Sequence, residues 1–277
     1  MKKIRAIQLK TRRILSGSMV GDSRTAKKGF GLEFEQLAEY QFGDDIRFID
    51  WKSSARTNKL LLKEYREERN RVVMLVVDGS RSNFYASGDR LKYEVIAEVA
   101  SIIALAAQNG KDAVGLILVT DKVELYIPPK NGRKHSNIIM EALFNFKPQS
   151  LGTNIAAGLK KLMQIKSRDM FCFLISDFID AHLEKDMRAA SQYHELVALH
   201  VQDSFEQALP DVGFLELVDL ESETKLVVNT NAETPNRYLA KHQDLLTKTF
   251  KNNNIKHMVI KPDQDYLYPL IKFLIRR

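Results

Sequence analysis

The middle of the chain alternates between short apolar runs and longer amphipathic segments. Runs of apolar and often β-branched residues predict buried strands at 72–77, 113–119, 123–127, 170–175 and 196–201. Between them, apolar residues at helical spacing predict helices at 90–109, 136–146, 155–166 and 181–193. Strands that are almost continuously apolar and alternate with helices favour a parallel sheet covered on both faces. We therefore predict an α/β fold with a doubly wound, mostly parallel sheet.

The two ends of the chain have a different pattern. Residues 1–70 are first basic, then rich in glycine and mixed charge, with one strand expected at 60–65. The C-terminal part predicts a hairpin from 214–219 and 225–229, a helix at 237–252, a strand at 256–261 and a helix at 266–275. We expect residues 1–70 to form a basic arm and a segment packed on the core. Residues 71–277 then form the main domain with a C-terminal hairpin and helix elaboration.

The positive charge of the chain is concentrated at its N-terminus. Of 277 residues, 42 are Lys or Arg and 35 are Asp or Glu, and residues 1–28 hold nine of the bases but one acid. The remaining chain is therefore nearly neutral, and no aromatic residue precedes Phe30 for base stacking. We expect no specific nucleic-acid binding. For residues 1–28 two interpretations stay open, attraction to an anionic surface and packing on their own domain.

The composition also indicates in which cellular compartment the protein is expected. The single cysteine, Cys172, excludes an internal disulfide and a zinc site built on several cysteines. No apolar run approaches the roughly 20 residues that span a bilayer, and no apolar signal-peptide core follows the basic N-terminus. These features predict a cytoplasmic protein without a transmembrane segment.

Three polar motifs lie where the predicted strands end or a helix begins. Asp78-Gly79-Ser80-Arg81-Ser82 follows the strand at 72–77, Ser176-Asp177 follows 170–175, and Gly152-Thr153-Asn154 opens a helix. Ligands of doubly wound sheets bind at the carboxyl ends of the strands, so these motifs should meet at one edge. The resulting candidate ligands are two carboxylates and three hydroxyls: Asp78, Ser80, Ser82, Thr153 and Asp177. An all-oxygen set suits Mg²⁺, Mn²⁺ or Ca²⁺ rather than zinc, although each motif alone is also typical of a helix cap or turn.

The spacing Asp-x-Ser-x-Ser, with the later Gly-Thr-Asn and Ser-Asp, matches the metal-ion-dependent adhesion site of von Willebrand factor A domains. Further motifs are GFGLEF at 29–34, YQFGDDIR at 40–47, DWK at 50–52 and DSFE at 203–206. Together they identify the chain as similar to a bacterial family, domain of unknown function 58, whose members contain a von Willebrand factor A-like domain. The resemblance implies that fold, with an N-terminal extension. It also implies a partner or adaptor of a MoxR-type AAA+ ATPase in stress response or protein maturation.

The function that we predict is a divalent-cation-dependent protein-interaction module rather than an enzyme. The alternative is a metal-dependent phosphoester hydrolase that uses Asp78 and Asp177. An aspartyl-phosphate mechanism at Asp78 would need a second carboxylate two residues later, where Ser80 stands.

A second group of acids lies in the N-terminal segment, at Asp44, Asp45 and Asp50. In a nuclease or phosphatase these carboxylates would bind metal. We instead expect them to form ion pairs with Arg47 and Arg56 that hold the segment on the sheet.

Overall fold

The computed structural model describes residues 32–57, 59–67, 71–85, 87–150, 152–179, 183–218 and 224–275. The chain divides into two compact units, one formed by Gly21–Asn70 and the other containing Arg71–Arg277. The basic segment 1–28 lies outside the described residues, so its expected role is not addressed by the structure. The packing of residues 1–70 on the core likewise stays a prediction.

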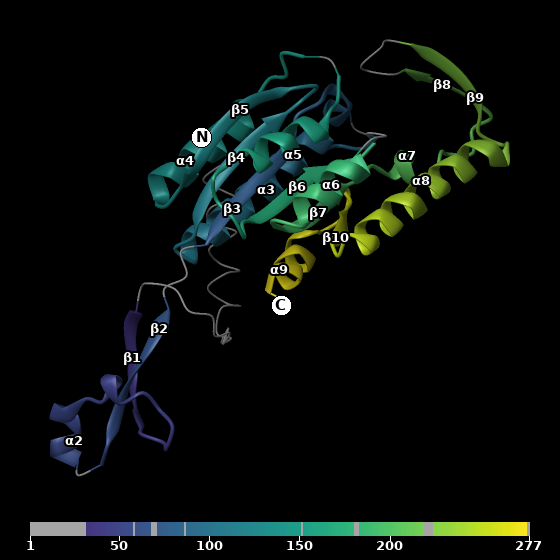
Figure 1. Ribbon diagram of the computed structural model, residues 1–277. Helices are drawn as coiled ribbons and strands as arrows, with labels where there is room; N and C mark the ends of the chain where they lie inside the picture. The colour runs from purple at the N-terminus through teal and green to yellow at the C-terminus, as the bar shows by residue number, and fades with distance from the viewer. Residues whose placement is uncertain are drawn as a thin grey trace. The chain divides into compact units, whose positions relative to one another are not determined.

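The larger unit is built on a six-stranded sheet with the order β10-β7-β6-β3-β4-β5 (Figure 1). Its strands are β3 (Val72–Asp78), β4 (Ala113–Val119), β5 (Val123–Lys130), β6 (Phe171–Ser176), β7 (Glu195–Val201) and β10 (Lys256–Ile260). All neighbours are parallel except β4 and β5. The chain passes from β3 to β4 on one side and later to β6 on the other, so the winding reverses at β3. This confirms the predicted doubly wound, mostly parallel sheet.

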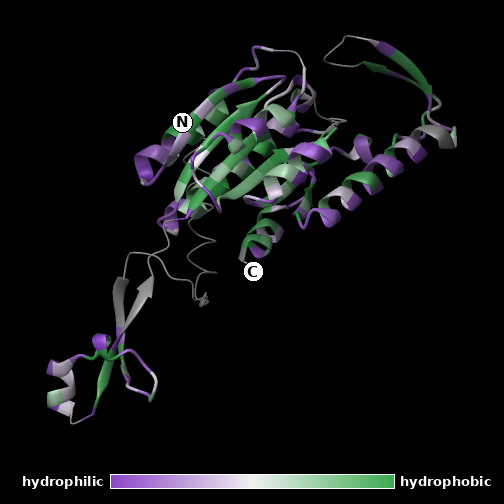
Figure 2. Ribbon diagram, viewed as in Figure 1, coloured by the Kyte–Doolittle hydropathy of each residue, from purple (hydrophilic) through white to green (hydrophobic). Residues whose placement is uncertain are grey.

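Helices cover both faces of the sheet and bury two apolar layers against it. One layer contains residues of α3 (Lys92–Asn109), α4 (Arg133–Asn145) and α9 (Leu267–Ile275). The other contains residues of α5 (Ile155–Met163), α6 (Leu183–Ser191) and α8 (Glu233–Asn252). Alternate residues of β3 contribute to opposite layers, Leu75 to the first and Met74 to the second. Burial on both faces explains why the strand sequences are almost continuously apolar, as the colouring of the central strands shows (Figure 2).

The strand predicted at 123–127 continues through Pro128 and Pro129 to Lys130. Proline lacks the N–H that a strand donates to its neighbour, so two successive prolines usually end a strand. They are tolerated in β5 because β5 lies at the edge of the sheet and pairs on one side only.

The C-terminal region contains the predicted hairpin of β8 (Phe214–Val218) and β9 (Lys225–Asn229), which pair antiparallel. Two short helices connect the larger elements, the 3₁₀ helix η2 (Arg81–Phe84) and α7 (Ser204–Gln207). They follow β3 and β7 directly and therefore lie at the carboxyl edge of the sheet.

The smaller unit contains an antiparallel pair, β1 (Leu32–Glu39) and β2 (Leu61–Glu67), with η1 (Ile46–Phe48) and α2 (Trp51–Thr57) between them. The sequence pattern did not predict β1. Its register shifts between Phe34 and Gln36. Such an irregularity interrupts the two-residue alternation by which a strand is recognised.

Close packing of α5 on the sheet depends on Gly158. A Cβ atom at this position would lie 2.6 Å from Val119 Cγ2 and 2.8 Å from Val76 Cγ1. We expect Gly158→Val to lower the free energy of unfolding by about 1–3 kcal/mol, because the added side chain overpacks this layer. Urea unfolding followed by circular dichroism measures the loss. Gly88→Val is the control, since a Cβ there meets no atom within 4 Å. Equal stability of the two variants would contradict the role given to Gly158.

Candidate functional site

The site is centred on Asp78, the last residue of β3. β6 runs parallel to β3 with Ile175 opposite Val77, so Ser176 ends its strand beside Asp78. The Ser176 hydroxyl donates to Asp78 Oδ2 at 2.7 Å, and the Ser80 backbone N–H donates to Asp78 Oδ1 at 2.9 Å. Asp78 is 2% exposed. Its carboxylate is therefore held by the end of β6 and by the loop after β3, and it is withdrawn from bulk water.

The loop after Asp78 passes close to the neighbouring elements because it begins with glycine. The Gly79 N–H donates to the Val119 carbonyl at the end of β4, over 2.7 Å. A Cβ atom on Gly79 would lie 2.3 Å from Phe146 Cε1. Only glycine allows the loop to pass this ring without a shift, and this fixes where the following serines lie.

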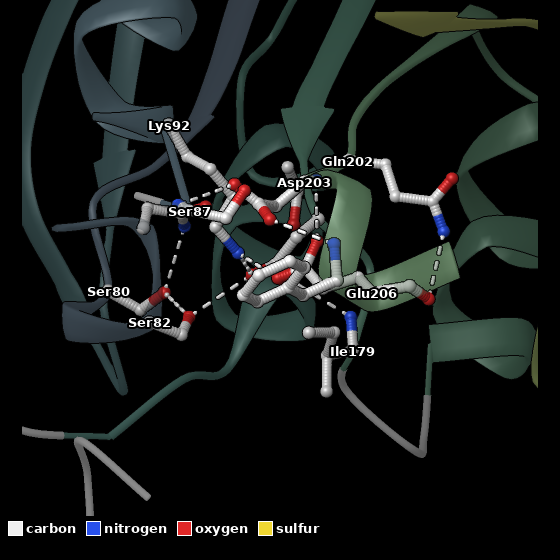
Figure 3. Close-up of polar contacts among 12 residues, drawn as sticks. Ser80, Ser82, Ser87, Lys92, Ile179, Gln202, Asp203 and Glu206 are labelled. Atoms are coloured by element: carbon white, nitrogen blue, oxygen red, sulfur yellow. Dashed lines mark hydrogen bonds and ion pairs between the residues drawn. The ribbon is translucent and has the colours of Figure 1, made fainter. Parts of the chain in front are cut away.

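A chain of side-chain hydrogen bonds links this loop to Asp177. Ser82 Oγ donates to Asp177 Oδ2 at 3.2 Å, and Ser80 Oγ lies 3.0 Å from Ser82 Oγ (Figure 3). The two serine hydroxyls are therefore in hydrogen-bond contact beside the Asp177 carboxylate. The Ser80 oxygen in turn accepts from Asn83 Nδ2 at 3.1 Å. The 3₁₀ turn of η2 thus aligns these groups toward one carboxylate.

The cluster contains a buried lysine that the sequence analysis did not select. Lys92, the first residue of α3, is 1% exposed, and its Nζ lies 2.8 Å from Asp177 Oδ2. The same ammonium forms an ion pair with Glu206 of α7 (Figure 3). Burial alone would lower the pKa of Lys92, but the charges of Asp177 and Glu206 outweigh it and raise the pKa above its ordinary value. Lys92 is therefore a permanent cation.

Glu206 is held in place by the turn in which it lies. Asp203 Oδ1 accepts from the Phe205 N–H at 3.0 Å, and Glu206 Oε2 accepts from the Asp203 N–H at 2.9 Å, which together form a capping box. Asp203 Oδ2 also accepts from the Ser87 N–H at 3.0 Å. The turn after β7 is thereby tied to the loop before α3, and Glu206 Oε1 faces Lys92.

Two signals in the sequence indicate these residues. Lys92 shares a helical stripe with Ile96 and Val99, and all three are buried. A lysine on such a stripe requires buried carboxylates as partners. Glu206 is the last residue of Asp-Ser-Phe-Glu, a spacing typical of a capping box, which places its carboxylate at a strand end.

The cluster carries more negative than positive charge. Burial, followed by the charge of the neighbouring Asp177, raises the pKa of Asp78 from its ordinary 3.8 to about 6. Burial likewise raises the pKa of Glu206, although the charge of Lys92 opposes this. The Lys92 ammonium pairs with the buried Asp177 and the half-buried Glu206, and Asp78 adds a further carboxylate, so the electrostatic environment favours a further cation.

The structure brings Asp78, Ser80, Ser82 and Asp177 into one hydrogen-bonded network. Thr153 lies at the same edge of the sheet, beside the end of β4, where the Asn154 N–H donates to the Thr120 carbonyl at 2.7 Å. The five predicted ligands are therefore found at the carboxyl edge, as expected from the topology, and their role as ligands stays a prediction.

The acids of the smaller unit are used locally. Asp45 forms the expected ion pair with Arg47, with 2.6 Å between Oδ2 and Nη2. Asp50 Oδ1 accepts from the Lys52 and Ser53 N–H groups at 3.1 Å and caps α2, and Asp50 Oδ2 lies 3.6 Å from Lys63 Nζ. Across the part of the chain that the structure describes, no group of three or more His, Cys, Asp or Glu side chains is arranged as a metal site.

The fold resembles several solved structures. BatB from Bacteroides thetaiotaomicron has 11% identity and a TM-score of 0.51, over 74% of this chain and 97% of that one. An aerotolerance-related membrane protein from Bacteroides fragilis has 15% identity and the same TM-score, over 74% of this chain and 96% of that one. The SpRpn10 von Willebrand factor A domain matches with 11% identity and a TM-score of 0.43, over 73% of this chain and 94% of that one.

The prediction of a cytoplasmic protein is wrong, because a structure with this fold comes from a membrane protein. The prediction relied on the shortness of the apolar runs and on the lack of an apolar signal-peptide core after the basic N-terminus. These runs are strands of the central sheet, so their length reflects the fold and carries no information about compartment. In the described residues, no helix has the length and apolar character needed to cross a membrane.

The raised pKa of Asp78 predicts a pH dependence of stability. Between about pH 4 and pH 6 the folded protein retains a proton on Asp78 that the unfolded chain has released. The free energy of unfolding therefore falls as pH rises through this window and levels off above it. Relative to Asp78→Asn, which has no titrating group, the wild type should lose up to about 3 kcal/mol from pH 4 to pH 7. Urea unfolding in EDTA measures this difference, and a difference that is constant with pH would contradict it.

Sequence comparison establishes the family. An uncharacterized protein of Mycobacterium tuberculosis is 25% identical over 280 residues, covering 99% of this chain and 88% of the relative. The uncharacterized protein YeaD of Bacillus subtilis is 31% identical over 99 residues, or 36% of this chain and 23% of the relative. The family model described as protein of unknown function DUF58 matches residues 36–245. With that match over most of its length, this chain belongs to the DUF58 family.

Proposed function

We propose that this protein is a divalent-cation-dependent protein-interaction module in which Asp78, Ser80, Ser82, Thr153 and Asp177 bind the ion. One observation carries the proposal. Two buried carboxylates and two serine hydroxyls, from loops 95 residues apart, meet in a single hydrogen-bonded network at the carboxyl edge of the sheet.

The chemistry of the cluster fits a hard cation. Its donors are carboxylate and hydroxyl oxygens, which Mg²⁺, Mn²⁺ and Ca²⁺ prefer. Asn83, which donates to Ser80, is buried, and its Oδ1 has no hydrogen-bond partner among the described residues. The cluster also carries more negative than positive charge, since it contains the carboxylates of Asp78, Asp177 and Glu206 and the Lys92 ammonium. A divalent ion would relieve that excess and would take its oxygens from these side chains.

A partner carboxylate would complete such a site. Two carboxylates and three hydroxyls supply fewer than the six or more oxygens that a hard cation takes, so water or a partner group must fill the remainder. The family resemblance implies a MoxR-type AAA+ ATPase as the partner, in stress response or protein maturation. We propose that an Asp or Glu of this ATPase binds the ion directly.

The alternative, a phosphoester hydrolase that uses Asp78 and Asp177, has less support. Both oxygens of Asp78 accept hydrogen bonds, and the carboxylate is buried, so it is badly placed to attack a substrate. A surface hollow of about 400 Å³ is lined by residues of α6, the start of β7 and the end of α8. It opens at the amino end of β7, the edge of the sheet opposite to the cluster.

Ion binding is tested by calorimetric titration of the full chain with Mn²⁺ and Mg²⁺. We expect Asp78→Ala to weaken binding by at least about tenfold, because a charged ligand is lost, and Ser82→Ala to weaken it less. Asp45→Ala is the control, since this exposed acid lies outside the cluster. Equal affinity of wild type and Asp78→Ala would overturn the proposed site.

Partner binding is tested by a pull-down of the MoxR-type ATPase with and without EDTA. Association should require the cation, disappear in Asp78→Ala and weaken in Thr153→Ala, where one neutral ligand is missing. Replacing the partner's acid by its amide should abolish binding, because an amide carries no charge to offset the ion. Phosphate-ester assays with Mg²⁺ or Mn²⁺ accompany the pull-down. Turnover that is lost in Asp78→Ala would favour the hydrolase, and association that survives both EDTA and Asp78→Ala would overturn the docking model.

A further inference from the structure

One carboxylate oxygen of Asp177 accepts hydrogen bonds from two side chains. Its Oδ2 accepts the Ser82 hydroxyl at 3.2 Å and the Lys92 ammonium at 2.8 Å. Its Oδ1 accepts the Ile179 N–H at 3.3 Å. An ion that uses Asp177 as a ligand therefore meets a positive charge already bound to the same carboxylate.

The position of Lys92 is costly for a cation. Lys92 begins α3, where the helix dipole disfavours positive charge, and it is buried. Burial of an ammonium is compensated only by carboxylates in good geometry, here Asp177 and Glu206. An apolar side chain would pack at this position without these demands. What the lysine adds is a positive charge at Asp177.

We propose that the Lys92 ammonium is a built-in counter-ion that competes with the divalent cation for Asp177 and is retained by Glu206 alone when the ion binds. This inference rests on the proposed function, because it concerns the same site. It explains why Lys92 has two carboxylate partners from different elements. The ammonium stays paired with Glu206 when the ion displaces its contact with Asp177. The buried positive charge therefore keeps a carboxylate partner.

The exchange also links the ion to the turn after β7. Glu206 holds the Asp203 N–H through Oε2 at 2.9 Å, and its backbone carbonyl accepts from Gln202 Nε2 and from Gln243 Nε2 of α8, both at 3.4 Å. A stronger ion pair between Lys92 and Glu206 would therefore change the position or the mobility of this turn. Residues Asp203–Gln207 should therefore respond to the ion although none of them is a proposed ligand.

The decisive experiment is a calorimetric Mn²⁺ titration of the wild type, Lys92→Met and Arg81→Met. Lys92→Met keeps the length of the side chain and removes the competing charge, so we expect Mn²⁺ to bind about tenfold more tightly than to wild type. Arg81→Met is the matched control. It removes the same charge from an exposed residue in the same loop as Ser80 and Ser82, and its affinity should stay within about threefold of wild type because its charge is screened.

The outcomes separate this inference from the proposed function. If wild type binds Mn²⁺ and Lys92→Met binds it no better than Arg81→Met, the inference is overturned and the ion site stands. If only Lys92→Met binds Mn²⁺, the lysine excludes the ion, which supports the inference and overturns the proposed function. If no variant binds, both are overturned.

A second pair of variants keeps the inference testable where Lys92→Met does not fold. Glu206→Gln preserves a side chain suited to the capping box but removes one of the two charges that pair with Lys92. Lys92 then pairs with Asp177 alone and competes more strongly with the ion, so Mn²⁺ affinity should fall by about fivefold or more. Glu184→Gln, an exposed residue of α6, is its control and should leave affinity unchanged. Equal affinities of these two variants would count against the exchange. Hydrogen exchange of residues 203–207 in the wild type should also change on Mn²⁺ addition, and unchanged exchange would contradict the link to this turn.

Discussion

The arrangement at the carboxyl edge of the sheet depends on the compensation of buried negative charge. Asp78 ends β3, Asp177 directly follows the neighbouring β6, and both are buried. Burial, followed by the charge of Asp177, raises the pKa of Asp78. Charge in such a place must be neutralised by a cation or by hydrogen bonds, or it is lost to protonation. Part of this charge is compensated by the serine hydroxyls, the backbone N–H groups and the Lys92 ammonium. The remaining excess of negative charge is what makes an ion site physically reasonable.

The doubly wound sheet is what allows so many groups to meet. Because the winding reverses at β3, the loops after β3 and β6 leave the sheet side by side and carry Asp78, the two serines and Asp177. The turn after β7 adds Glu206, and the first residue of α3 adds Lys92. Burial of the strands on both faces makes the sheet rigid, so the loops at its edge start from fixed positions.

Compensation by a lysine distinguishes this cluster from one that depends on an ion alone. The Lys92 ammonium pairs with Asp177 and Glu206, so part of the negative charge is compensated by the protein itself. In this arrangement an ion adjusts an existing balance of charge and does not create the site. In the exchange that we propose, loss of the contact between Lys92 and Asp177 offsets part of the free energy of ion binding.

The amino-acid sequence was sufficient to predict the class of the fold and the edge of the sheet at which the candidate site lies. Apolar runs separated by amphipathic segments predicted the parallel sheet, because a strand buried on both faces must be apolar throughout. Asp78, Ser80, Ser82, Thr153 and Asp177 could be assigned to one edge because the carboxyl ends of parallel strands share an edge. The register shift concealed β1, since a shifted strand loses its alternation, and the prolines of β5 were acceptable only at the edge of a sheet.

Which charged side chains contact one another became clear from the three-dimensional packing. Lys92 and Glu206 lie 114 positions apart in the chain, and the local sequence around each does not identify the other as its partner. Their contact depends on how α3 packs and on the turn after β7. The sequence of neither element indicates that the two lie close together. Local patterns specify the elements because backbone geometry acts over a few residues, whereas ion pairing in the interior depends on distances in space that sequence spacing does not contain.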